Sequence, residues 1–377
     1  MESASRSDPS GSVSTRLGHA VHQAIADQGG WLAFDQFMAL VLYAPNIGYY
    51  ANASIKFGAL PSSGSDFITA PEMSPYFGRA LAAQVAQALQ ACGGGGGGGG
   101  GVTEFGAGSG ALAEQLIDAL AGLGWGDVPY RIIDVSGELM ARQRARLARF
   151  GERVQWLDAW PDAIDGAVIC NEVLDAMPVQ LLHFDGQHWF ERGVSSRHGG
   201  FAWHDRPTEL RPLLDAPFVP GTTVEIHPQA LAWTQGLAQR LRCGVAILID
   251  YGFPEAEFYL PQRHGGTLMC HRAHRSDADP LSDVGLKDIT AHVNFSAIAQ
   301  AAQDAGCDVL GYTSQARLLL NCGITDLLSL ASLPQRVMAQ KLINEHEMGE
   351  LFKVLMFARG CAFDPIGFST GDRTHRL

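Results

Sequence analysis

The chain has 377 residues, of which 46% are hydrophobic, and its mean hydropathy is +0.02. These values are typical of a globular protein with one elaborated α/β domain or with two domains. The formal net charge of -12 and the presence of only four lysines argue against a nucleic-acid-binding domain, which normally carries a basic surface.

The cysteines and the absence of targeting signals indicate the compartment. The seven cysteines are widely spaced and contain no Cys-x-x-Cys pair, so neither a disulfide framework nor a zinc site is predicted. Cys270, His271 and His274 match no standard metal spacing, and we interpret them as loop residues. No run of about 18 apolar residues occurs, and no secretory or transit signal is recognisable. We therefore expect a cytoplasmic protein with no membrane span and no metal.

The first part of the chain is predicted to be helical around a long loop. Residues 1–15 are rich in serine and are predicted to form a disordered tail. Residues 16–92 form the predicted N-terminal helical and lid region. Apolar residues recur at helical spacing over 16–44, which predicts two helices on either side of Gly29 and Gly30, and over about 77–91, which predicts a third helix. The stretch between the second and the third helix is rich in Gly, Ser, Pro and aromatic residues, which is typical of a functional loop.

Nine glycines at 93–101 separate this region from the rest of the chain. A tract without side chains loses much entropy on ordering, so we interpret it as a flexible connector without chemistry. A short strand at 102–106 follows, and then Gly106, Ala107, Gly108 and Gly110 lead into a helix at 110–122. Alternating glycines between a strand and a helix allow a ligand to approach the backbone and the free N–H groups of the helix. The pattern predicts a nucleotide-cofactor site.

Two acids narrow the choice of cofactor. Glu104 lies at the end of the first strand, where a carboxylate would repel a pyrophosphate and attract the ammonium and sulfonium of S-adenosyl-L-methionine (SAM). Asp134 ends a second strand at 130–134, where an acid can accept hydrogen bonds from ribose hydroxyls. These acids favour SAM. Gly106, Gly108 and Ala111 also satisfy the permissive form of the NAD fingerprint, so an NAD-dependent oxidoreductase stays an alternative.

The rest of the chain alternates strands and helices, which predicts a mostly parallel sheet covered on both faces. Short strands between 179 and 241 are interpreted as an antiparallel insertion, and the helical stretch 315–350 as a second insertion. The last two strands are predicted at 308–313 and 352–358.

Five segments together resemble a known family. They are Gly64–Gly78, Glu104–Gly110, Asn171–Pro178, Ile249–Gly252 and Asp288–Phe295. The chain resembles the MidA family of class I SAM-dependent methyltransferases, whose mitochondrial member is a respiratory complex I assembly factor that methylates a protein arginine. The resemblance implies a Rossmann-like α/β fold with a seven-stranded, mostly parallel sheet, and a SAM-binding methyltransferase domain over 102–377.

The resemblance also implies cofactor contacts. It places Gly106, Gly108 and Gly110 at the methionine part of SAM, Asp134 at the ribose, Val135, Ser136 and Asp158 at the adenine, and Asn171 and Glu172 opposite the sulfonium. In such sheets ligands bind at the carboxyl ends of the strands, so polar residues at strand ends are candidates for functional residues. The predicted cofactor set also includes Glu104, Ala107, Gly64 and Thr69.

The predicted reaction is methyl transfer to a protein side chain, an arginine according to the resemblance. A carboxylate can grip a guanidinium and orient its attacking nitrogen. The candidate catalytic acids are Glu172, Asp175, Asp66, Glu72 and Glu225. Glu172 is the first choice; Asp175 could equally cap a helix, and Asp66 could be a turn residue. The predicted partner is a protein substrate and not a nucleic acid. A SAM-binding assembly protein with little catalysis is the other alternative.

Overall fold

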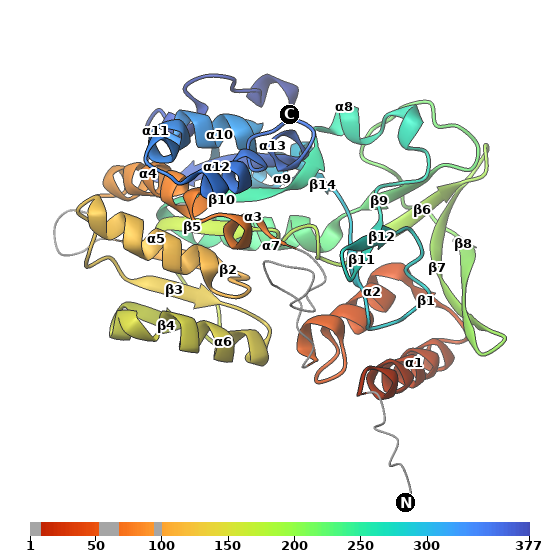
Figure 1. Cartoon of the computed structure of the whole chain (residues 1–377). Coiled ribbons are helices and arrows are strands. Elements are labelled where there is room, and N and C mark those ends of the chain that lie inside the picture. Colours follow the sequence, from red (N-terminus) through yellow and green to blue (C-terminus); the bar gives the residue numbers. More distant parts are fainter. Residues whose placement is uncertain (1–8, 53–67, 94–99) are drawn as a thin grey trace, which may run out of the picture. The chain divides into compact units, whose positions relative to one another are not determined.

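The computed structural model describes residues 9–52, 68–93 and 100–377, with side chains from residue 13. The chain divides into two compact units, each assembled from several stretches of sequence (Figure 1). The first unit comprises Met1–Phe67, Ala176–Gln229 and Tyr259–Ala291, and the second comprises Ile68–Asp175, Ala230–Phe258 and His292–Leu377. Among the helices of the described ranges, none is both long and apolar enough to cross a bilayer.

The second unit is built on a mostly parallel sheet, as predicted. Its strands are β2 (Gly101–Phe105), β3 (Tyr130–Ile133), β4 (Val154–Trp156), β5 (Ile164–Asn171), β10 (Leu241–Phe253), β14 (Val293–Asn294), β15 (Asp308–Ser314) and β16 (Phe352–Arg359). Seven of them follow the order β15-β16-β10-β5-β2-β3-β4, and β16 runs antiparallel to both neighbours. The short strand β14, which the sequence pattern did not predict, adds to β10.

Helices cover this sheet because the middle parts of its central strands β5 and β10 are apolar on both faces. Ile169 and Ile247 belong to the core formed with the helices before and after β2, while Val168 and Leu248, which alternate with them, are equally buried. Burial of both faces is typical of parallel sheets. The helices are α3 (Ala70–Met73), α4 (Tyr76–Ala91), α5 (Ala111–Gly122), α6 (Gly137–Leu147), α7 (Pro228–Arg240), α8 (Glu255–Phe258), α9 (Phe295–Asp304), α10 (Gln315–Asn321), α11 (Ile324–Ser329), α12 (Leu333–Gln340) and α13 (Met348–Leu351).

The end of the glycine tract is part of the sheet. Residues 94–99, most of the predicted connector, lie outside the described residues, but Gly101 begins β2. A Cβ on Gly100 would lie 2.2 Å from the carbonyl carbon of Asp165, on the neighbouring strand. A Cβ on Gly101 would lie 2.6 Å from the carbonyl oxygen of Pro129, so neither of these two glycines leaves room for a side chain.

We expect Gly100→Ala to lower the free energy of unfolding by at least about 1 kcal/mol, because the strands must separate to admit the methyl group. Gly126→Ala is the matched control, since a Cβ there meets nothing within 4 Å. Chemical denaturation of the two variants measures the difference. Equal stability would show that the strand contact at Gly100 is absent in solution.

The first unit combines N-terminal helices with antiparallel strands. Helices α1 (Pro9–Asp27) and α2 (Phe34–Tyr43), with the 3-10 helix η1 (Tyr49–Ala51), precede the lid segment; its residues 53–67, like residues 1–8 of the predicted tail, are outside the description. The strands are β1 (Leu32–Ala33), β6 (Gln180–Phe184), β7 (Trp189–Arg197), β8 (Gly200–Pro207), β9 (Thr223–Ile226), β11 (Met269–Arg272), β12 (Arg275–Asp277) and β13 (Asp288–Thr290). All their pairings are antiparallel, and the strands β6 to β9 lie in the stretch 179–241, for which short antiparallel strands were predicted.

The core of this unit joins segments that are far apart in sequence. Val21 of α1 and Phe37 of α2 belong to one buried cluster with Leu181 of β6, Val194 of β7 and Ile289 of β13. The helical periodicity of α1 and α2 predicted an apolar face. It could not predict that this face packs on β6, β7 and β13, which come much later in the chain.

Two local interpretations of the sequence need correction. Helix α1 begins at Pro9, so residues 9–15 are helical and do not belong to a disordered tail; proline is well tolerated in a first helical turn. The segment around Cys270 is not a loop, because β11 and β12 form a hairpin there. Ala273 and His274 adopt positive φ at its turn, and Cys270 is buried against β13.

Candidate functional site

The ends of four strands meet at one edge of the parallel sheet. Phe105 of β2 pairs with Ile133 of β3 and Cys170 of β5, and Ile249 of β10 pairs with Asn171. Gly106 follows β2 and Asp134 follows β3, Asn171 is the last residue of β5, and Asp250 follows Ile249 within β10. This edge is where ligands bind in open α/β sheets.

The glycine loop has the conformation that its sequence predicts. Gly106, Gly108 and Gly110 have φ of 64°, 54° and 82°, a region that other residues rarely adopt. Gly106 is exposed, and a Cβ on it would lie 3.0 Å from Cγ2 of Val173. Gly110 caps α5, whose free N–H groups follow the loop, while Ala107 is buried. Backbone rather than side chains therefore lines this part of the edge.

Gln143 of α6 joins the loop to the neighbouring strand end. Its amide nitrogen donates to the carbonyl of Gly108 at 3.0 Å and to Asp134 Oδ2 at 2.8 Å. Its amide oxygen accepts from Nε1 of Trp156 at 3.0 Å. Because Gln143 is fully buried, these bonds fix the loop and the acid with respect to each other.

Glu104 is a buried carboxyl group in the middle of the sheet. It is 2% exposed, and Tyr130 donates to its Oε2 from the phenol oxygen at 2.7 Å. Burial raises its pKa to about 8, and the charge of Asp134 adds to this rise, while the bond from Tyr130 opposes it. The carboxyl group is therefore largely protonated at neutral pH in the free protein, and a cationic ligand nearby would favour its ionised form.

The pKa of Asp134, the acid that follows β3, is also raised. Asp134 is half-buried, and burial is the main cause; hydrogen bonds from Ser136, Gln143 and the backbone of Val135 and Gly108 partly oppose it. Ser136 accepts from the backbone nitrogen of Leu139 at 3.3 Å and thereby caps α6.

The adenine-side residues of the prediction lie at the ends of β3 and β4. Val135 is 81% exposed, which is unusual for a valine. Asp158 lies two residues beyond β4, and its side chain is exposed.

The turn after β5 is strained. Glu172 has φ of 57°, which costs a non-glycine residue about 1 to 2 kcal/mol. Asn171 donates from Nδ2 to Glu172 Oε1 at 3.0 Å, whereas the buried Oδ1 of Asn171 has no hydrogen-bond partner within the described ranges. Strain and an unsatisfied polar atom cluster at functional sites. Both point to this turn as a place where a ligand completes the structure.

Asp250 holds this turn in place. Its Oδ2 accepts from the backbone nitrogens of Val173 at 3.1 Å, Leu174 at 2.8 Å and Asp175 at 3.3 Å, and its Oδ1 accepts from the nitrogen of Tyr251 at 2.9 Å. Burial raises the pKa of Asp250 to about 7 despite these bonds. Asp175, a predicted catalytic candidate, is itself buried in the turn. Asp250, which lies three residues before the end of β10, thus positions the strained segment.

Glu72 of α3 is engaged by the glycine loop and by α6. Its Oε1 accepts from the hydroxyl of Ser109 and from Arg146 Nη1, the latter at 3.0 Å. Arg146 also donates to Ser109 Oγ at 2.8 Å and forms an ion pair with Glu114. Thr69 precedes α3 and accepts from the backbone nitrogen of Met73. Glu72 therefore lies beside the cofactor loop, where it is bound to Arg146.

Glu225 lies on β9 of the first unit. It is 1% exposed, and its Oε1 accepts from the backbone nitrogens of Thr267 and Leu268 at 2.7 and 3.1 Å. Burial raises its pKa. The remaining candidates, Asp66 and Gly64, lie outside the described residues.

The structure assigns positioning roles to two residues, Gln143, which the sequence analysis did not single out, and Asp250, which lies in the family segment Ile249–Gly252. Gln143 lies four residues from both Leu139 and Leu147, on the buried face of α6. A polar residue at a position where the helical spacing predicts an apolar one could have indicated its role. For Asp250, the place near a strand end was a weaker signal.

Comparisons with known proteins agree with this geometry. Over residues 80–313, more than half of the chain, the sequence matches the family described as "Putative S-adenosyl-L-methionine-dependent methyltransferase". A Burkholderia thailandensis protein described as a "likely methyl transferase" and crystallised with S-adenosyl-homocysteine is 47% identical, with a TM-score of 0.93 and 100% of both chains covered.

Curated relatives are more distant. The mitochondrial protein arginine methyltransferase NDUFAF7 homolog of Caenorhabditis elegans is 26% identical, over 92% of this chain and 88% of that protein. Its Xenopus tropicalis counterpart is 27% identical, over 86% and 81%. Both are named mitochondrial, which contradicts the expected cytoplasmic location. Composition and the lack of a recognisable targeting signal were insufficient grounds for that expectation.

Proposed function

The chain belongs to the family of S-adenosyl-L-methionine-dependent methyltransferases, and we propose that it transfers the methyl group to an arginine side chain of a protein. The family membership agrees with the predicted resemblance and cofactor. The names of the NDUFAF7 relatives support the arginine acceptor. The strained Glu172, at the strand end beside the glycine loop, is the observation that carries the proposal for this chain.

The described residues fit the cofactor. The lack of a side chain at Gly106 leaves space beside Val173 that a Cβ would partly fill. Asn171 Oδ1 is a buried acceptor that a hydrogen-bond donor of the ligand could satisfy. In the proposal, the glycine loop and Glu104 hold the methionine part, Asp134 accepts from the ribose hydroxyls, and the exposed Val135 packs on the adenine. When bound, SAM supplies an electrophilic methyl group on a sulfonium.

Glu172 has two tasks in the proposed reaction. Its carboxylate accepts hydrogen bonds from the guanidinium and so holds one nitrogen in line with the methyl group. It also accepts the proton that this nitrogen loses as the new N–C bond forms. The bond from Asn171 Nδ2 and the backbone held by Asp250 fix the position of the carboxylate.

Methylation with isotope-labelled SAM tests the acceptor. The full chain is incubated with a protein extract of its source organism, and the modified residues are identified by mass spectrometry. We expect methylarginine in a protein. The same incubation with Glu172→Gln in place of the parent chain is the control for other methyltransferases in the extract, and this methylarginine should be absent from it. Label on lysine, on a hydroxyl group or only on small molecules would refute the arginine proposal.

Cofactor choice is tested by calorimetry. We expect binding of SAM and S-adenosylhomocysteine but not of NAD, because the cationic methionine part can pair with the ionised form of Glu104, whereas a pyrophosphate would keep Glu104 protonated and lose that attraction. Affinity for SAM should rise with pH up to about 8, by at most about tenfold per unit, because the cation favours the ionised carboxylate and binding releases its proton. In Glu104→Gln this rise should flatten. Preferential binding of NAD would overturn the assignment.

The same group makes stability depend on pH. Between its ordinary value of 4.5 and about 8, the folded chain binds more protons at Glu104 than the unfolded chain does. The stability of the ligand-free protein should therefore be highest below pH 4.5 as far as Glu104 is concerned, and should fall as the pH rises through 8. Thermal unfolding of the parent and of Glu104→Gln between pH 5 and 8 measures this slope. A steeper slope in the variant would contradict the assigned pKa.

A further inference from the structure

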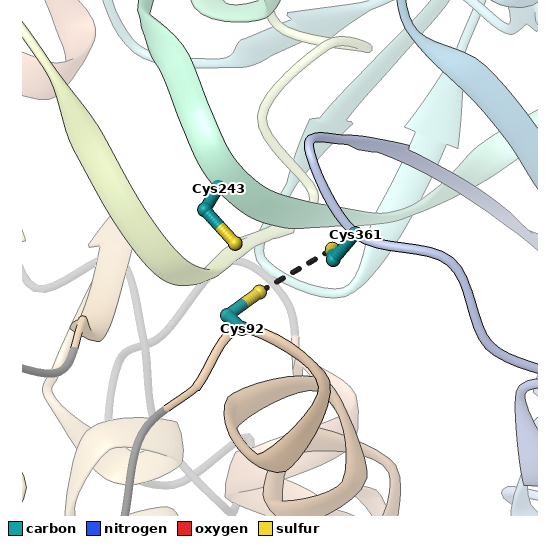
Figure 2. Close-up of side chains that lie close together, drawn as sticks. All are labelled: Cys92, Cys243 and Cys361. Atoms are coloured by element: carbon teal, nitrogen blue, oxygen red, sulfur yellow. Dashed lines mark hydrogen bonds between the residues drawn. The ribbon is translucent and has the colours of Figure 1, made fainter. Parts of the chain in front are cut away.

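Three cysteines that are remote in sequence meet at one point of the second unit. Cys92 follows α4, Cys243 lies on β10, and Cys361 comes two residues after β16. Their sulfur atoms all lie within 4.8 Å of one another, and those of Cys92 and Cys361 are 3.4 Å apart. Figure 2 shows the three side chains pointing toward a common centre from a helix end, a strand and a loop.

This cluster lies away from the cofactor edge. Cys243 pairs with Asp165 near the beginning of the parallel strand β5, whereas the glycine loop and Glu172 follow the ends of such strands. Cys361 lies just beyond Arg359, which pairs with Gly244 at the same end of the sheet. The cluster therefore has no part in holding SAM or its acceptor.

The spacing suits a metal ion bound by sulfur. A zinc–sulfur bond of about 2.3 Å places tetrahedrally arranged sulfur atoms about 3.8 Å apart, and the observed separations of 3.4 Å to at most 4.8 Å bracket this value. Each side chain is half-buried, and all three cysteines are free. Water is thus partly excluded, while an ion still has access.

We propose that Cys92, Cys243 and Cys361 form a site for a thiophilic d10 cation, zinc(II) or copper(I). The three thiols lose their protons to solvent, three sulfur–metal bonds form, and no group is oxidised or reduced. Soft thiolate ligands select these two ions. Within the described part of the chain, no further His, Cys, Asp or Glu belongs to the group, so water completes a zinc site and copper(I) is three-coordinate.

Such an ion ties together three segments of the fold. Its ligands join the end of α4 to the start of β10 and to the segment after β16. The unfolded chain does not hold these cysteines together, so the cation binds the folded state and stabilises it.

The test uses the reduced full chain under anaerobic conditions, titrated separately with zinc(II) and copper(I) against competing chelators. We expect one ion per chain and a higher melting temperature with the preferred ion. Cadmium(II) should produce a thiolate-to-metal charge-transfer band. Single Cys→Ser variants of the three ligands should weaken metal binding by at least about 100-fold. Mutation of a residue that only supports a ligand costs up to about 100-fold in metal affinity, and loss of a ligand itself should cost at least as much. Cys307→Ser, which alters a buried cysteine elsewhere, should have no effect.

A second measurement does not depend on the folding of variants. In the parent chain, the bound ion should slow alkylation of Cys92, Cys243 and Cys361 but not that of Cys307, as read by mass spectrometry. The proposal is overturned if neither ion is retained at one per chain, if Cys307→Ser weakens binding as much as the ligand variants do, or if bound metal leaves the three alkylation rates unchanged. It is also overturned if peroxide joins Cys92 to Cys361 in a chain that binds neither ion, since the cluster would then be a redox pair.

Discussion

Replacement of Gly106 by valine is expected to lower the affinity for SAM by at least about 100-fold. The residue has φ of 64°, where a β-branched side chain costs about 1 to 2 kcal/mol, and its Cβ would lie 3.0 Å from Val173 Cγ2. The new methyl groups would also fill the space that we assign to the methionine part of the cofactor. Calorimetric titration with SAM measures the loss.

Gly124→Val separates the two contributions. Gly124 follows α5 with φ of 88°, but a Cβ there meets nothing within 4 Å. The control therefore introduces similar backbone strain away from the loop, and it should lower the melting temperature while SAM affinity stays within about twofold of the parent. If Gly106→Val bound SAM as well as Gly124→Val does, the cofactor would have to bind elsewhere.

Features that depend on local sequence could be predicted. The strand, the three glycines and the helix after them are a contiguous pattern, and the structure gives each glycine the positive φ that the pattern requires. The predicted helices at 77–91 and 110–122 likewise agree with α4 and α5 to within about two residues. In such segments the signal and the structure lie in the same short stretch.

Features that depend on tertiary contacts could not be predicted from the sequence. Asp250 is remote in sequence from the backbone nitrogens of residues 173–175 that it binds, and no local pattern reveals this. Glu225 is a second example, because no local pattern indicates that its carboxylate accepts hydrogen bonds from the backbone of residues 267 and 268. The three clustered cysteines have no metal-binding spacing in the sequence because each comes from a different segment.

The acids of the candidate site differ in burial and in backbone conformation. Glu104 and Asp250 are buried and bound by neighbours, and Glu72 is paired with Arg146. Glu172 is only partly buried, and its backbone is strained. Strain persists where surrounding structure maintains it, here through Asp250. On this comparison Glu172 is the strongest candidate for contact with the methyl acceptor.

Glu172→Gln is expected to lower methyl transfer by about 100-fold or more while SAM affinity stays within severalfold of the parent. The amide retains the shape and one acceptor oxygen, but it neither carries the charge that holds a guanidinium nor accepts its proton. Glu172→Gly is the companion variant, because glycine adopts φ of 57° without strain. Its free energy of unfolding should stay within about 1 kcal/mol of the parent, although its methyl transfer should be lost as well.

The two variants together distinguish a catalytic role from a structural one. Single-turnover methyl transfer, calorimetry with SAM and chemical denaturation are measured on both. Loss of transfer with cofactor affinity and stability retained is the expected result. Loss of SAM affinity in step with activity would make Glu172 a cofactor ligand. Unchanged activity would pass the role to Asp66, Glu72, Asp175 or Glu225, of which Glu72 is to be tested first, because it already contacts the cofactor loop through Ser109.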